Sequence, residues 1–250
     1  MTKVSQYLVA IVLFLVSIIT SYAQEIISVE KFNKAIISPH IQVTFEEGPE
    51  ESVTIESASV SRDKINIEVE GKTLRIYLDG AKMITKTEKE YNHKGWKTRK
   101  PIYKGTQVVA KVTYKNIKEL SIRGEEIIVC KSPIEQEDFK LKVYGEPKIT
   151  MNALKTEGLN VTMYGEGYLE VKEGSVDSQK YTVYGEGEVN TLGMNNGRTK
   201  ITAYGEGNFR INVSDNLKVT AYGEATVAYN GNPSINKGII IGKAKIQKMK

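Results

Sequence analysis

Five glutamates recur in the second half of the chain, each two positions after a tyrosine in the sequence Tyr-Gly-Glu. The pairs are Tyr144 and Glu146, Tyr164 and Glu166, Tyr184 and Glu186, Tyr204 and Glu206, and Tyr222 and Glu224. A row of carboxylates can bind cations or hydrogen-bond to a glycan, and aromatic faces can stack on sugar rings. Two carboxylates about 5 Å apart can also hydrolyse a glycosidic bond with retention. We take these ten residues as the first candidate ligand-binding site.

Catalysis by this set is not expected. A catalytic carboxylate pair needs two different environments that separate the two pKa values, and identical repeats provide the same environment each time. Only His40 and His93 supply imidazole, so we expect no metal site with several histidines. The chain has neither a Gly-x-Ser-x-Gly elbow nor a phosphate loop. We therefore predict a protein without catalytic residues, metal or cofactor, with a polysaccharide-active β-helix enzyme as the alternative.

The spacing of the motif indicates how these residues are positioned. The copies from Tyr144 to Tyr204 follow one another at a constant step, and the step to Tyr222 is slightly shorter. A period near twenty is typical of a solenoid in which one short unit stacks on itself, about 4.8 Å per rung for parallel strands. Stacking would place the tyrosines in one column and the glutamates in another. The alternative is that exposed carboxylates and a stacked aromatic ladder serve stability alone.

Apolar alternation around each motif predicts strands. Leu141 and Val143 precede the first copy, and Leu169 and Val171 follow the second. Glycine tolerates positive φ, so the Gly-Glu element is the expected corner between two strands of one rung. We predict an all-β fold, a parallel β-helix whose rungs begin with Leu120–Glu125. Residues 117–250 would form the repeats and, near Ile239–Ile246, a C-terminal cap.

Residues 24–116 are expected to form an N-terminal β region whose strands cap the other end. Within it, residues 81–105 are rich in lysine and break the alternation, which indicates a long loop or a projecting hairpin. This basic loop could engage anionic glycan or lipid head groups, with an aromatic contact platform. The alternative is a solvated charged loop without a ligand. The second candidate site consists of Lys94, Trp96, Lys97, Arg99 and Lys100.

The segment Met1–Ala23 has the pattern of a secretory signal peptide. Lys3 precedes an apolar run, and Ser21-Tyr22-Ala23 fits a cleavage site. We expect an exported protein of the periplasm, outer surface or medium, with no transmembrane segment after cleavage. Cys130 is the only cysteine, which excludes an intramolecular disulfide. The formal net charge of +5 is modest for this length, so nucleic acid is not an expected partner.

The chain resembles a family of secreted bacterial domains, the putative auto-transporter adhesin, head GIN domain. The opening carries Phe32-Asn33-Lys34, the strand Ser52–Glu56 and the pair Ile65 and Ile67. The rungs carry Tyr204–Phe209 where family members have Ser-Gly-Ser-Gly-Asp-Ile, and Tyr229–Pro233 fits the close. The resemblance implies a parallel β-helix. Together with the candidate surfaces, it leads us to expect a binding or adhesion role at the cell envelope, with a glycan or another envelope component as partner. A purely structural envelope protein is the further alternative.

Overall fold

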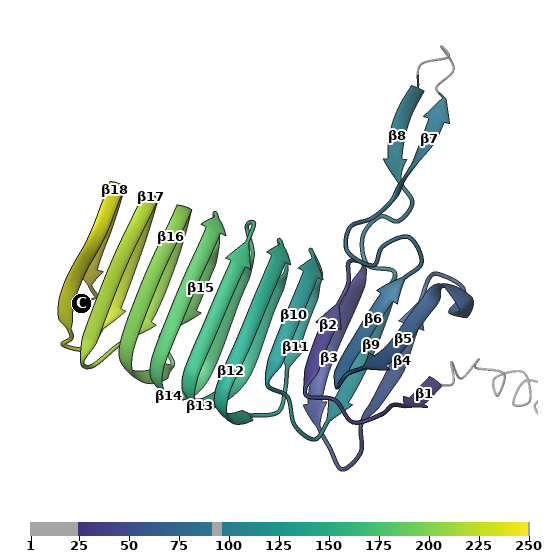
Figure 1. Ribbon diagram of the computed structural model, residues 1–250, viewed down its shortest axis with the longest axis horizontal. Coiled ribbons are helices and arrows are strands. Elements are labelled where there is room, and N and C mark those ends of the chain that lie inside the picture. Colours follow the sequence, from purple (N-terminus) through teal and green to yellow (C-terminus); the bar gives the residue numbers. More distant parts are fainter. Residues whose placement is uncertain (1–24, 92–96, 250) are drawn as a thin grey trace, which may run out of the picture.

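The computed structural model describes residues 25–91 and 97–249, which form one elongated stack of β-coils with a projecting hairpin (Figure 1). The predicted signal peptide lies outside the described residues. Sixteen strands belong to one sheet and two to a second sheet. The only helix in the described part is the single 3-10 turn η1 (Arg62–Lys64), and no described helix is long and apolar enough to cross a membrane.

The C-terminal half is the predicted parallel solenoid. Its strands pair in parallel, each with the equivalent strand of the next coil. The pairing of β13 with β14 sets Tyr164 opposite Tyr184, so the register follows the period of the motif. The predicted fold class is therefore confirmed. The strands are β10 (Glu119–Gly124), β11 (Ile127–Cys130), β12 (Ile134–Gly145), β13 (Lys148–Tyr164), β14 (Tyr168–Gly185), β15 (Glu188–Thr191), β16 (Met194–Asn212), β17 (Asn216–Asn230) and β18 (Ser234–Lys248).

Each coil contains three straight segments joined at corners. Within β13 the pairing with β14 breaks at Asn152 and Glu157, which divides the strand into three paired stretches. The third corner is the Gly-Glu element, where Gly165 and Gly185 have φ of +119° and +118°. A Cβ on Gly185 would lie 2.6 Å from the carbonyl oxygen of Gly165. Glycine is therefore required there twice over, by backbone conformation and by the closeness of the next coil.

The N-terminal strands contribute more than a cap. Four of them continue the parallel stack, and β2 lies between β6 and β10 while β3 lies between β9 and β11. The spatial order of the coils thus differs from their order in sequence, and strands from both sides of Ile117 share one sheet. The four strands are β2 (Lys34–Ile37), β3 (Ile41–Glu47), β6 (Thr73–Leu78) and β9 (Val108–Tyr114).

Antiparallel strands close this end of the stack. β5 (Ile65–Glu70) covers the edge of β6, and β4 (Ser52–Ala58) covers the edge of β9. β1 (Glu25–Ser28) then pairs with β4. At the other end, β18 pairs with β17 alone and forms a further coil (Figure 1), so the expected C-terminal cap is a repeat of the same unit.

The core runs along the inside of the coils as ladders of equivalent side chains. One ladder is buried throughout and consists of Leu141, Val161, Tyr181, Ile201 and Val219. Its one polar side-chain atom, the Tyr181 hydroxyl oxygen, donates through its hydrogen to Gln179 Oε1 at 2.7 Å. Gln179 Nε2 in turn donates to Thr199 Oγ1 at 2.9 Å. These buried polar groups are thereby paired within and between coils.

Residues 81–105 contain a hairpin, one of the two structures expected there. β7 (Thr87–Tyr91) and β8 (Lys97–Pro101) form a separate antiparallel pair that projects from the stack (Figure 1). Every residue of β8 is exposed. The insert leaves the stack after β6 and rejoins it at β9, so it occupies the corner where other coils carry the Gly-Glu element.

Candidate functional site

The five repeated tyrosines stand in one continuous column. Tyr144, Tyr164, Tyr184, Tyr204 and Tyr222 are register partners on successive coils. Neighbouring ring centroids are 5.1, 4.8, 4.7 and 4.9 Å apart, with interplanar angles of 7°, 3°, 3° and 4°. The spacing equals one strand separation because identical rotamers repeat on each coil. The predicted column of tyrosine rings is therefore present.

This parallel stacking changes what the tyrosines can offer a ligand. The two faces of each inner ring are covered by the neighbouring rings, which leaves no room for a sugar ring between them. The expected stacking of sugars on aromatic faces is therefore wrong for the inner rings. Tyr164, Tyr184 and Tyr204 remain 42%, 38% and 40% exposed through their edges and hydroxyl groups. The column thus presents a row of phenolic hydroxyls, which can donate and accept hydrogen bonds.

The ends of the column differ from its middle. Arg123 is the register partner of Tyr144, and its guanidinium carbon lies 4.6 Å from the ring centroid. Ile241 is the partner of Tyr222 at the C-terminal end and is 62% exposed. The column is therefore bounded by a cation at one end and an aliphatic side chain at the other.

The five repeated glutamates lie at the adjacent corners and are all exposed. Glu206 and Glu224 are register partners, as the repeat predicts. Lys243 takes the glutamate position on the last coil, and its Nζ lies 3.2 Å from Glu224 Oε1. Among the described residues no group of histidine, cysteine, aspartate and glutamate has the geometry of a metal site. Solvent exposure keeps the repulsion between adjacent carboxylates small.

Two further columns lie beside the tyrosines on the same outer face, and the Tyr-Gly-Glu motif did not predict them. Residues two and four positions before each tyrosine point to the same side of a strand. They share the period of the motif, which is the signal that could have revealed them. One column contains Thr162, Thr182, Thr202 and Thr220, and the other Lys140, Asn160, Lys180, Lys200 and Lys218.

The second candidate site is only partly described. Lys94 and Trp96 lie outside the described residues. Lys97, Arg99 and Lys100 belong to β8, where the alternation of an antiparallel pair places Lys97 and Arg99 on one face with Lys89. Lys100 lies on the other face and forms a salt bridge with Glu90. The hairpin therefore has one basic face, and a second face that carries Glu88, Glu90 and Lys100.

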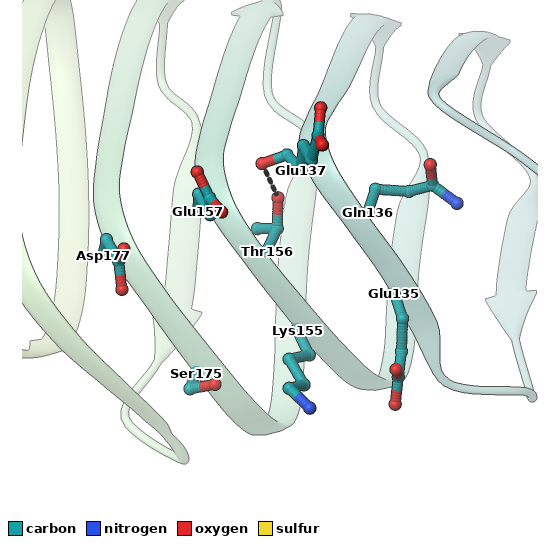
Figure 2. Close-up of a pocket in the computed structure, with 8 residues that line it drawn as sticks. All are labelled: Glu135, Gln136, Glu137, Lys155, Thr156, Glu157, Ser175 and Asp177. Atoms are coloured by element: carbon teal, nitrogen blue, oxygen red, sulfur yellow. Dashed lines mark hydrogen bonds between the residues drawn. The ribbon is translucent and has the colours of Figure 1, made fainter.

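A shallow acidic pocket of about 320 Å³ lies on another side of the stack (Figure 2). Three carboxylates, from Glu137, Glu157 and Asp177, come from equivalent positions of β12, β13 and β14 and recur once per coil. The Thr156 hydroxyl beneath them donates to the Glu137 carbonyl oxygen at 2.8 Å. The sequence carries a signal for this column, because Glu137, Glu157 and Asp177 follow one another at the period of the Tyr-Gly-Glu motif.

The remaining reactive groups have structural roles. Cys130 is fully buried, and burial raises the pKa of its thiol to about 12, which makes it unreactive at neutral pH. His40 Nδ1 donates to the Gly105 carbonyl oxygen at 2.8 Å, and His40 Nε2 lies 2.6 Å from Thr85 Oγ1. These bonds connect the segments before and after the hairpin, at Thr85 and Gly105, to the stack. His93 lies outside the described residues.

Comparison with known proteins places this geometry in a family. The family model described as "Putative auto-transporter adhesin, head GIN domain" matches residues 31–233. No curated protein matches the chain. The crystal structure of a putative adhesin from Bacteroides fragilis has a TM-score of 0.75 at 15% identity and covers 90% of this chain and 96% of its own.

Two further crystal structures of putative adhesins have the same fold. The one from Parabacteroides merdae has a TM-score of 0.63 at 21% identity. The one from Parabacteroides distasonis has a TM-score of 0.64 at 19% identity. In both comparisons, 91% of this chain and 96% of the other chain are covered. The family model covers most of the chain, and the chain therefore belongs to the putative auto-transporter adhesin, head GIN domain family.

Proposed function

We propose that this protein is an exported, non-enzymatic binding protein of the cell envelope that holds an extended glycan along the tyrosine column. One observation carries the proposal: the column repeats a half-exposed phenol on five successive coils, with ring spacings between 4.7 and 5.1 Å. An extended polymer with a repeat of similar length can meet equivalent hydrogen-bonding groups on each coil. The membership in an adhesin-like family supports a binding role in general terms.

The two flanking columns suit the same ligand. The threonine hydroxyls lie one alternation step from the tyrosines, and the lysine column borders them. Hydroxyls and amines along a flat strand face can bind sugar hydroxyls and acidic sugar substituents without a deep pocket. The ligand would thus lie along the stack axis, in contact with edges of rings rather than with their faces.

The test removes the hydroxyls while keeping the rings. The triple variant Y164F/Y184F/Y204F retains the stacked column, and Y168F changes a tyrosine outside it as the matched control. We expect glycan-array binding to a wild-type ligand to fall at least tenfold in the triple variant and to stay unchanged in Y168F. Equal binding by the triple variant would remove the hydroxyl row as the site.

The same array separates the alternatives. A wild-type protein that binds no glycan would favour a purely structural envelope role. Release of reducing ends from a polysaccharide, abolished in the E166Q/E186Q double variant, would establish the enzymatic alternative. Loss of binding in E166Q/E186Q without any turnover would extend the proposed site to the glutamate column.

A further inference from the structure

The positions of the tyrosine column continue past Arg123 onto two more coils, but the nearer of these positions carries only a serine. Ser38 follows Ile37, which pairs with Ile122 on one side and with Ile76 on the other. The column positions on these coils are therefore Tyr77, Ser38 and Arg123. Tyr77 and Arg123 stand two strand spacings apart, about 9.6 Å, with Ser38 between them, and the Ser38 hydroxyl donates to the Lys82 carbonyl oxygen at 2.7 Å. A notch forms where every later coil carries a larger side chain.

The notch is a small cavity with a high density of positive charge. Its volume is about 110 Å³, and three of its lining residues are the cations Arg75, Lys82 and Arg123. Lys82 Nζ lies 4.2 Å from the Tyr77 ring centroid and 3.7 Å from Glu68 Oε2, so its charge is partly compensated. No carboxylate of the described chain forms a salt bridge with Arg75 or Arg123.

One hydrogen-bond donor of Arg123 has no acceptor within the described residues. This donor is the buried Nε of Arg123. Its guanidinium is held over the Tyr144 ring, which fixes its orientation at the border of the notch. A buried donor without a partner is unfavourable, and the other guanidinium N–H groups of Arg123, which lines the notch, can donate to an anion there.

An apolar cavity adjoins the notch. It has a volume of about 320 Å³ and shares Met83 and Arg123 with the notch. Met83 and Ile84 are 62% and 81% exposed, although both line this cavity. Contiguous exposed apolar side chains beside a cavity are typical of a ligand-binding surface.

Two glutamates line the apolar cavity, and one of them is engaged in contacts within the stack. Glu126 is buried, accepts the Glu125 N–H at 3.0 Å on Oε2 and lies 3.9 Å from His40 Nδ1 through Oε1. Glu125 is exposed at the corner, lines the same cavity and forms no salt bridge among the described residues. The bonds of His40 to Thr85 and Gly105 hold the segment that carries Met83 and Ile84 against the stack. Both cavities are thus built on anchored backbone.

We propose that the two adjacent cavities together bind a single-chain anionic amphiphile. Its phosphate or carboxylate head would occupy the notch beside Arg75, Lys82 and Arg123. Its hydrocarbon chain would cover Met83 and Ile84 in the larger cavity. The site lies at the N-terminal end of the column, where Tyr144 lines the larger cavity, and it does not include the exposed inner rings of Tyr164, Tyr184 and Tyr204.

Calorimetric titration with decyl phosphate below its critical micelle concentration tests the site. We expect the wild type to bind it, R123Q to bind at least tenfold more weakly, and M83S/I84S to lose affinity to a similar extent. R210Q removes an exposed arginine far along the stack and should bind as the wild type does. The Y164F/Y184F/Y204F variant should also bind normally, which keeps this result separate from that of the glycan array.

Two further ligands separate the contributions of head and chain. Inorganic phosphate and decanol should each bind at least tenfold more weakly than decyl phosphate. Should R123Q fail to fold, R75Q supplies the head-group test. Arg75 does not stack on the tyrosine column as Arg123 does, so its replacement leaves that contact intact. Wild-type affinity for decyl phosphate in the folded arginine variant, or equal affinity for phosphate alone, would overturn the proposal.

Discussion

The guanidinium carbon of Arg123 lies 4.6 Å from the centroid of the Tyr144 ring and closes the tyrosine column on its N-terminal side. On the next coil toward the N-terminal end of the stack Ser38 takes the same position, and the column is interrupted there. One regular surface therefore has two candidate binding parts: a hydroxyl row over the repeats and a cationic notch at their border. The stability of both parts depends on the stacking geometry.

Removal of one inner ring should destabilise the stack. Tyr184 lies between Tyr164 and Tyr204, with centroid distances of 4.8 and 4.7 Å. Aromatic pairs contribute about 0.5–1.5 kcal/mol each, so Y184A should lower the free energy of unfolding by about 1–2 kcal/mol. Y184F keeps the ring and should stay within about 0.5 kcal/mol of the wild type. Urea unfolding followed by far-UV circular dichroism measures both, and similar losses for the two variants would contradict ring stacking as the cause.

Alanine at a repeat corner should be far more costly than alanine at an ordinary positive-φ glycine. Gly185 has φ of +118°, and a Cβ there would lie 2.6 Å from the Gly165 carbonyl oxygen. Gly71 has φ of +53° and nothing within 4 Å of the added Cβ. We expect G71A to cost about 1 kcal/mol and G185A about 3 kcal/mol or more, up to failure to fold. Thermal unfolding of both variants checks this, and equal costs would show that the contact between coils is not limiting.

The charge on Glu119 should stabilise the protein in a pH-dependent way. Its Oε1 lies 3.0 Å from Lys34 Nζ and 3.1 Å from Lys142 Nζ. Burial acts to raise the pKa of the Glu119 carboxyl, but the interactions with the two lysines outweigh it and hold the pKa below its ordinary value. The stabilising contribution is therefore complete above the unfolded pKa of about 4.3 and is lost as the pH falls through the lower folded value.

E119Q should accordingly lower the free energy of unfolding by about 1 kcal/mol relative to the wild type at neutral pH. The difference should shrink below about pH 4 and vanish near complete protonation. Urea titrations at several pH values measure it. The matched control is E173Q, which replaces an exposed glutamate that has no salt bridge in the described part of the chain. A pH-independent difference for E119Q would show that packing, and not charge, is responsible.

Much of the repeat region could be predicted from the sequence because its units are alike. When Leu141–Tyr144 and Val161–Tyr164 carry the same pattern, parallel pairing in register places equivalent residues in the same environment. The period of the motif therefore predicted the fold class, the corner glycines and the tyrosine column. The ladders of buried side chains followed from alternation along each strand.

The N-terminal coils could not be predicted in the same way. Lys34–Ile37 pairs with Glu119–Ile122, far along the chain, and with Thr73–Ile76 on its other side, and none of these segments carries the Tyr-Gly-Glu motif. No local pattern specifies which of the strands of similar alternation become neighbours. Alternation alone indicated these strands only as a cap, but burial against both neighbouring coils decided their place in the stack.

The sequence by itself determined that equivalent residues of the repeats align, since identical units can bury their apolar faces only against one another. Only the tertiary structure decided which surfaces those residues present. It covered the faces of the inner tyrosine rings with other tyrosines, and it brought Ser38 beside Arg123 from a distant part of the chain. Ring orientation and long-range strand order depend on packing between coils, and that packing has no counterpart in the spacing of residues along the chain.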